Sequence, residues 1–186
     1  MKRRCLALFA LALSLGSGTT AEYVSARRKL DLIEHDKLRP GARLVLSERE
    51  LNAWVANEFM QLAPQGVRDP RLEVGRGSAS GSALIDFVKV RQAQGKPPGW
   101  LASKLLAGER PVRVTTRIRS GAGQATVDVE RVEISGIAVE GRMLDFLIQN
   151  YLAPNYPEAK IGKPFELGHR IDRLELAPAS VGILIR

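Results

Sequence analysis

The sequence predicts an α+β protein in which a curved antiparallel sheet, built from hairpins, packs against two apolar helices. Apolar residues recur at spacings of three and four in residues 47–63 and 143–152, which is the helical period. They alternate with polar residues in segments 72–87, 111–134 and 174–185, which is the period of strands. The order of these segments separates helices from hairpins, and that separation is typical of the α+β class.

Composition indicates one folded domain. The chain has 186 residues, of which 45% are hydrophobic and 26% charged, and its formal net charge is +8. This profile excludes disordered, collagen-like and low-complexity classes. We expect three parts: a signal peptide over residues 1–21, an N-terminal helix or linker over 22–40, and a single α+β domain over 41–186.

The first residues have the three parts of a secretory signal peptide. Basic residues 2–4 precede an apolar run over 5–15, and small residues follow up to Ala21. We expect an exported, periplasmic protein that is cleaved after about Ala21, with an uncleaved anchor as the alternative. The mature chain then contains no cysteine, which suits a bacterial periplasm without structural disulfides.

An amphipathic helix is predicted over residues 22–38, because apolar side chains recur there at helical spacing, and Pro40-Gly41 ends it. A short apolar stretch then precedes the clearest local signal in the chain. Ser47 and Glu50 form a capping box, and Leu46 and Leu51 flank it as a hydrophobic staple. The helix that follows carries one apolar stripe and stops before Pro64. Its stripe consists of Leu51, Trp54, Val55, Phe59 and Leu62.

A first hairpin is predicted over residues 72–87, with a flexible turn through the glycine- and serine-rich residues 75–81. The second hairpin covers 111–134 and turns at residues 120–123. Pairing Arg119 with Gln124 would set its register. That register places Val114 opposite Val129, Thr116 opposite Val127 and Arg113 opposite Glu130. The apolar set changes from odd to even positions after Glu130, which predicts a bulge near Glu130-Arg131 or a change of faces.

The second apolar helix covers residues 143–152 and ends at Pro154. Apolar residues dominate so much of its circumference that we expect most of its surface to be covered. The chain closes with a hairpin whose strands meet at a Pro178-Ala179 turn.

The sequence contains little that could support catalysis or metal binding. It has two histidines, His35 and His169, and one cysteine, so we expect no metal site and no cofactor. Asp86 is the most unusual acid, because it lies between Ile85 and Phe87 in an apolar strand. It could be a general base, but such a residue more often points to solvent or pairs with a lysine such as Lys89. We therefore expect no enzymatic activity.

Two surfaces are candidates for contact with a membrane or a partner protein. One is the segment around Trp100, which combines apolar residues with lysines; the alternative is a loop helix that fills the core. The other is an arginine row on alternate positions of a strand, for which a solvated, cross-paired face is the alternative. No aromatic residues interleave with these arginines, so nucleic acid is not an expected partner. The candidate residues are Trp100, Leu101, Leu105, Arg113, Arg117 and Arg119.

The chain resembles small bacterial envelope proteins of the TULIP type over about residues 40–186. The resemblance rests on four features: the Leu46-Ser47-x-x-Glu50-Leu51-Asn52 helix start, paired long strands, residues 132–137 leading into an apolar helix, and the last hairpin. It implies a long curved sheet folded around a helix, with lipid or another apolar molecule in the groove between them. The side chains expected at this groove, which ordinary core positions would explain equally well, are Trp54, Phe59, Phe87, Phe146 and Leu147.

These observations favour a non-enzymatic periplasmic protein that binds a lipid or other apolar ligand between its helices and the concave sheet face. Such a site needs a cavity of roughly 300 to 1,000 Å³. The alternative is an envelope interaction module with a solid core, which would bind a partner protein or a membrane surface.

Overall fold

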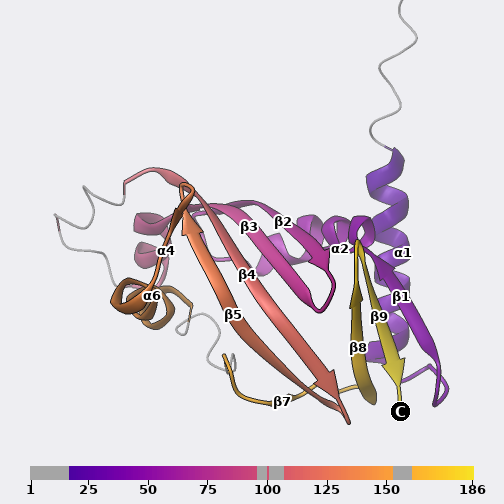
Figure 1. Ribbon diagram of the computed structural model, residues 1–186. Coiled ribbons are helices and arrows are strands. Elements are labelled where there is room, and N and C mark those ends of the chain that lie inside the picture. Colours follow the sequence, from indigo (N-terminus) through magenta and orange to yellow (C-terminus); the bar gives the residue numbers. More distant parts are fainter. Residues whose placement is uncertain (1–16, 96–99, 101–106, 153–160) are drawn as a thin grey trace, which may run out of the picture.

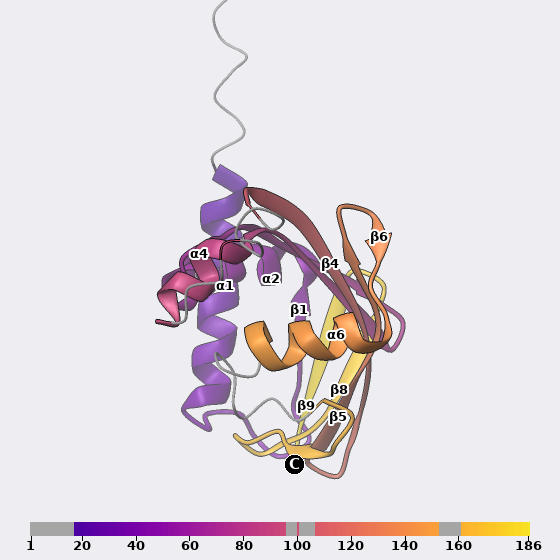
Figure 2. The same ribbon diagram turned by 90° about the vertical axis from the view of Figure 1, so that its left-hand side faces the viewer.

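The computed structural model describes residues 17–95, 100, 107–152 and 161–186, and it confirms the α+β class. A three-stranded antiparallel sheet and a larger antiparallel sheet lie side by side, and helices cover one side of each (Figures 1 and 2). The helix α1 and the small sheet lie at one end of the molecule, while α4 and α6 lie at the other end.

Helix α1 (Ser17–Glu34) packs against the small sheet and forms the hydrophobic core with it. Ala26 and Ile33 of α1 are buried with Leu46 and Ile183 from two strands, and Trp54 packs against this cluster. The helix therefore covers most of the range expected for an N-terminal helix, but it begins at Ser17 and ends at Glu34. It also continues through Ala21, the position predicted for cleavage.

The predicted capping box is confirmed after strand β1 (Arg43–Ser47). The Glu50 amide donates to Ser47 Oγ at 3.2 Å, and the Ser47 amide donates to Glu50 Oε2 at 2.8 Å. The helix runs through three consecutive segments and stops before Pro64 as predicted. These segments are α2 (Glu48–Trp54), the π-helical η1 (Val55–Phe59) and α3 (Met60–Leu62).

Glu50 also links α2 to α1. Its side chain is 9% exposed and accepts hydrogen bonds from Ser25 Oγ and Lys29 Nζ of α1, each at 2.6 Å. Burial raises the pKa of this carboxyl, but the hydrogen bonds from Lys29, Ser25 and Ser47 outweigh burial and lower the pKa to about 2. The network therefore holds an ionised carboxylate between the two helices.

The larger sheet has the order β2-β3-β4-β5-β6, and β7 pairs with β5. The turn of its first hairpin is shorter than predicted, because β3 begins at Ser78 and only Arg76 and Gly77 connect the strands. The predicted flexible stretch is thus mostly strand. Its strands are β2 (Val67–Gly75), β3 (Ser78–Asp86), β4 (Glu109–Gly121), β5 (Gln124–Ile134), β6 (Ile137–Ala138) and β7 (Phe165–Glu166).

The predicted register of the second hairpin is wrong by two residues. Gly121 pairs with Gln124, so the turn contains only Ala122 and Gly123, whose φ angles are 52° and 78°. Two consecutive positive φ angles are typical of the type I′ turn, which matches the twist of a hairpin. The bulge is confirmed, because Thr116 pairs with Val129 while Thr115 pairs with Arg131, and Glu130 is the extra residue.

The final hairpin is confirmed, with β8 (Ile171–Ala177) and β9 (Ser180–Ile185) joined at Pro178-Ala179. Strand β1 adds to β9, which gives the order β1-β9-β8. Ser120 joins the two sheets, because its hydroxyl donates to the Leu174 carbonyl at 3.0 Å and accepts from the Leu174 amide at 2.8 Å. A serine side chain thus takes the place of a strand partner along β8.

The helices α4 (Phe87–Ala93), α6 (Gly141–Leu147) and η2 (Ile148–Leu152) lie on the inner side of the larger sheet (Figure 2). The expected coverage of the second apolar helix is wrong. No residue of α6 is buried, and Met143 and Phe146 are 58% and 45% exposed. The helix turns one apolar side toward the sheet and leaves another exposed.

Candidate functional site

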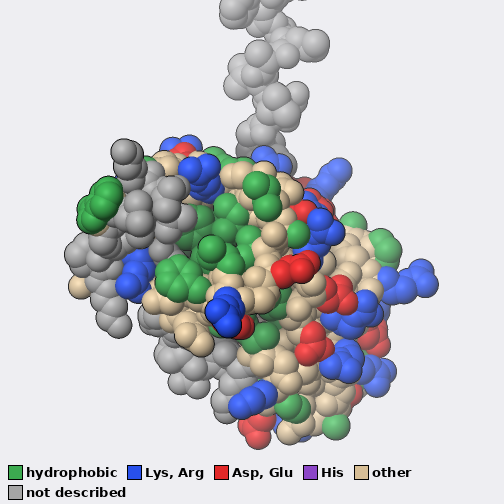
Figure 3. All heavy atoms as spheres, turned by 60° about the vertical axis from the view of Figure 1, so that its left-hand side comes forward, with side chains coloured by type: hydrophobic (Ala, Val, Ile, Leu, Met, Phe, Trp, Pro, Cys, Tyr) green, Lys and Arg blue, Asp and Glu red, His purple; other side chains and the backbone are tan. Residues whose placement is uncertain are grey.

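A cavity of about 490 Å³ lies between the larger sheet and the helices η1, α4, α6 and η2. This volume falls within the range of small-molecule sites. Figure 3 shows apolar side chains gathered in a hollow on one face of the molecule. The described lining residues are Val55, Phe59, Pro64, Val67, Pro70, Arg71, Leu72, Gly81, Ser82, Ala83, Ile85, Phe87, Val90, Val112, Val114, Val129, Val132, Ile134, Leu144, Leu147, Ile148 and Ile161.

The sheet side of the cavity owes its space to small residues in the middle of β3. Gly81 and Ala83 face the helices, and a Cβ built on Gly81 would meet only Leu72 Cδ2, at 3.9 Å. Two larger side chains at these positions would occupy part of the cavity. The sheet therefore leaves room here by residue size, without any break in its pairing.

The bulge at Glu130 keeps the sheet side apolar along β5. Val129 lies before the bulge and Val132 after it, and both line the cavity. Without an extra residue, an interval of three would place their side chains on opposite faces, because strand side chains alternate. The extra residue thus allows the valines on both sides of the bulge to face the cavity.

Both π-helical segments of the described chain border the cavity. Val55 and Phe59 of η1 line it, as does Ile148 of η2. Single π-helical turns within helices are rare and frequently occur at functional sites. The same side of the cavity is completed by Phe87 and Val90 of α4, which are 4% exposed each.

Only two described lining residues, Arg71 and Ser82, have polar side chains. They pair with each other across β2 and β3, while Leu72 pairs with Gly81. Because neighbouring side chains on a strand point to opposite faces, Arg71 and Ser82 point away from the face that carries Leu72 and Gly81. The described interior is therefore hydrocarbon, which suits an apolar ligand and offers no acid, base or nucleophile.

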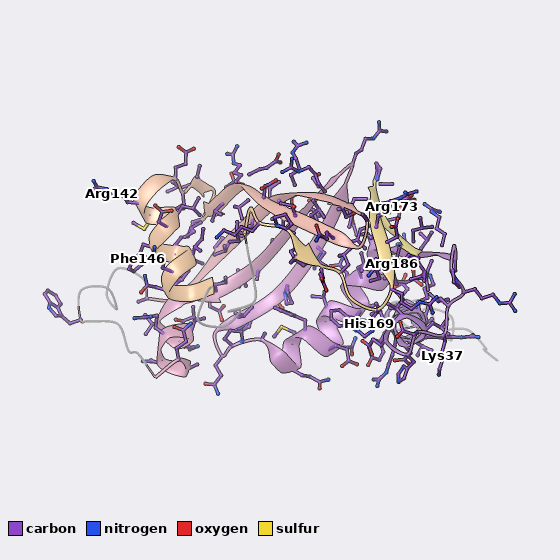
Figure 4. All side chains as sticks on the ribbon, turned by 90° about the horizontal axis from the view of Figure 1, so that it is seen from below. Lys37, Arg142, Phe146, His169, Arg173 and Arg186 are labelled. Atoms are coloured by element: carbon purple, nitrogen blue, oxygen red, sulfur yellow. The ribbon has the colours of Figure 1, made fainter. Side chains whose placement is uncertain are left out.

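Three of the five predicted groove residues line the cavity: Phe59, Phe87 and Leu147. Trp54 lies one position before η1 and packs against the hydrophobic core instead. Phe146 lies on α6 with its side chain 45% exposed, at the end of the molecule opposite His169 and Arg173 (Figure 4).

Most of the aliphatic residues that line the cavity were not among the site residues predicted from the sequence. Val112, Val114, Val132 and Ile134 all belong to the alternating patterns that predicted the strands. Alternation identifies the inner face of a sheet, but it cannot distinguish a packed inner face from one that borders a cavity.

The arginine row is a cross-paired face of the sheet. Arg117 Nε lies 2.6 Å from Glu130 Oε1, and Arg119 Nη2 lies 2.6 Å from Asp128 Oδ2. Arg113 forms an ion pair with Glu73, whose hydrogen bonds from the guanidinium lower the pKa of the carboxyl below its ordinary value. Figure 3 shows basic and acidic side chains interleaved at the right of the view. Each arginine of the row is matched by a carboxylate.

The remaining candidates lie outside the cavity lining. Trp100 is 79% exposed, and Leu101 and Leu105 lie outside the described residues. Asp86 ends β3 and caps α4: its Oδ1 accepts from the amides of Val88 and Lys89 at 3.1 Å, and Lys89 Nζ lies 3.5 Å from Oδ2. Of the interpretations considered for Asp86, pairing with Lys89 matches this geometry, and helix capping adds to it.

Two further properties concern the described part of the chain. It contains no group of three or more histidine, cysteine, aspartate or glutamate side chains arranged to hold a metal ion. None of its helices combines the length and the apolar character that crossing a membrane would need.

Comparison of the chain with protein-family models and with curated proteins found no match. The function is therefore inferred from the geometry of the cavity.

Proposed function

We propose that this protein is a non-enzymatic periplasmic protein that binds a lipid or another apolar ligand in the cavity between its larger sheet and its helices. The observation that carries the proposal is a cavity of about 490 Å³ whose described inward-facing side chains are all apolar. Burial of an apolar ligand there would be driven by the hydrophobic effect, which scales with the apolar area removed from water. The signal-like segment of residues 1–21 and the resemblance to TULIP-type envelope proteins agree with this function.

A cavity-filling variant tests the proposal. Native mass spectrometry of the purified protein after incubation with total bacterial lipid should show lipid adducts. Ala83→Phe should remove most of them, because the new side chain occupies the space that the ligand needs. Ser82→Leu is the matched control, since the neighbouring position points to the opposite face and the adducts should persist.

The proposal fails if the wild-type protein gives a clean ligand-free mass under conditions that preserve other non-covalent complexes. It also fails if Ala83→Phe, folded by circular dichroism, retains the same adducts as Ser82→Leu.

A second candidate function, contact with a membrane surface, is favoured by exposed apolar side chains. Trp100, Ile137 and Met143 are 79%, 71% and 58% exposed, and β6 and α6 lie at the same end of the molecule (Figure 2). Indole and aliphatic groups of this kind bind the boundary between headgroups and acyl chains.

Vesicles of bacterial phospholipid provide the test of this second function. The double variant Ile137→Asp, Met143→Asp should lose co-sedimentation with the vesicles. Val24→Asp, which changes an equally exposed valine on α1, should retain it. Unchanged co-sedimentation of the double variant would exclude this surface.

A further inference from the structure

The cavity adjoins a polar junction between α4 and η2. Val90 of α4 and Ile148 of η2 line the cavity, and their near neighbours Arg91 and Asn150 connect the two helices. Arg91 Nη1 lies 3.3 Å from the carbonyl oxygen of Asn150 and 3.5 Å from Gln94 Oε1. The junction thus places a guanidinium and an amide next to a site whose interior is hydrocarbon.

Gln94 carries an unused hydrogen-bond donor at this junction. Its Nε2 atom is buried and has no acceptor among the described residues. A buried donor without an acceptor opposes folding, so it is rare in native structures and calls for a physical explanation. An acceptor supplied by a ligand would satisfy it.

The cavity is large enough for the apolar part of that ligand. One water molecule takes up about 30 Å³ in the liquid. At that volume per atom, about 490 Å³ accommodates at least on the order of 16 non-hydrogen atoms. This is enough for one acyl chain.

We propose that the ligand is a single-chain amphiphile with an anionic head that accepts hydrogen bonds, such as a carboxylate. Its chain occupies the cavity, and its head lies at the α4–η2 junction. There Gln94 Nε2 donates a hydrogen bond to the head, and Arg91 contributes its positive charge. This inference rests on the proposed function, because it specifies the ligand of the same cavity.

Two ligands with the same chain separate recognition of the head from binding of the chain. Palmitate and palmityl alcohol differ only in the head, and isothermal titration at pH 8 measures both affinities. The wild-type protein should bind palmitate at least about tenfold more tightly, because hydrogen bonds to a charged acceptor are the stronger ones. Gln94→Leu and Arg91→Met should each weaken palmitate binding about tenfold and change palmityl alcohol binding less than about twofold.

Each variant has a matched control, one on α4 and one on α6. Gln92→Leu changes an exposed neighbour on α4, and Arg142→Met removes an exposed cation from α6 (Figure 4). Both should bind palmitate as the wild type does. Gln94→Leu should also raise the melting temperature of the ligand-free protein, because it removes a buried donor without an acceptor. If Gln94 had only a structural role, Gln94→Leu would lower the melting temperature of the ligand-free protein.

The inference is overturned if Gln94→Leu leaves palmitate affinity unchanged, or if it weakens both ligands equally. Binding of dipalmitoyl phosphatidylglycerol with the affinity of palmitate would overturn its single-chain part. If neither palmitate nor palmityl alcohol binds the wild-type protein, the proposed function itself fails. If both bind and the variants have no effect, the cavity function stands and only recognition of the head is lost.

Discussion

Glu50 is a buried carboxylate whose charge depends on side chains from two helices. Ser25 and Lys29 of α1 and Ser47 at the start of α2 all donate to it. Its pKa of about 2 lies below the ordinary value of 4.5, so the folded state favours the ionised form. One pKa unit corresponds to about 1.4 kcal/mol, so this carboxylate contributes on the order of 3 kcal/mol to the free energy of unfolding at neutral pH.

The pH dependence follows from the sign of this shift. The stabilisation is complete above the ordinary pKa of 4.5 and is lost as the pH falls through about 2. Glu50→Gln should therefore lower the free energy of unfolding at pH 7 by about 2 to 3 kcal/mol, and it should flatten the decline in stability below pH 4.5. Urea unfolding between pH 2 and pH 7 measures both effects.

Glu34→Gln, at an exposed position near the end of α1, is the control for charge removal and should change stability by less than about 0.5 kcal/mol. An equal loss at pH 3 and pH 7 for Glu50→Gln would contradict this account of Glu50.

At the scale of single residues, the sequence predicted the capping box from Ser47 and Glu50, which are three residues apart. It could not predict Ser25 and Lys29, because contacts across 25 and 21 residues depend on how α1 packs.

Helix α4 has only seven residues, and Asp86 satisfies its first amides. Asp86→Ala should lower the free energy of unfolding by about 1 to 2 kcal/mol, since it removes the N-cap acceptor and leaves two amides unbonded. The same variant should weaken ligand binding, because Phe87 and Val90 of this helix line the cavity. Thermal unfolding and ligand titration measure the two effects.

Asp86→Asn keeps an oxygen acceptor at the same place and should lose only a few tenths of a kcal/mol. If the asparagine variant were as unstable as the alanine variant, the charge of Asp86 rather than its capping bonds would be the stabilising feature. The alternating residues around Asp86 predicted a strand, and the structure shows why it is unusual there: the strand ends at Asp86 and the helix begins after it.

The second hairpin shows which features of an element the alternation of apolar residues can predict and which it cannot. The change from odd to even apolar positions predicted either a bulge or a change of faces, and the structure has the bulge. The register was wrong because a four-residue turn and a two-residue turn both preserve the same alternation. The difference depends on Ala122 adopting a positive φ of 52°, which is uncommon for alanine.

At the scale of the whole molecule, packing divides the protein into two ends. Around α1 and the small sheet, buried side chains such as Ala26 and Leu46 form a close-packed core. Under α4 and α6, the inner face of the larger sheet borders the cavity instead. The end with this core can hold the fold together while the other end keeps space for a ligand.

A ligand that binds only the folded protein should raise its melting temperature. Palmitate at about one hundred times its dissociation constant should stabilise the folded state by about 2.7 kcal/mol. For a chain of this size that corresponds to an increase of about 5 to 10 °C. Differential scanning calorimetry should show this increase for the wild type and none for Ala83→Phe; an unchanged midpoint for the wild type would contradict binding in the cavity.

The sequence by itself determined the α+β class, the capping box, the irregularity near Glu130 and the final hairpin, because propensity, alternation and turn chemistry act between residues close in the chain. Tertiary structure alone decided which apolar residues enclose the cavity and which fill the core. Trp54 and Phe59 belong to one predicted stripe, yet Trp54 packs against the core and Phe59 lines the cavity. A space between elements depends on how those elements meet, and no short segment of sequence contains that information.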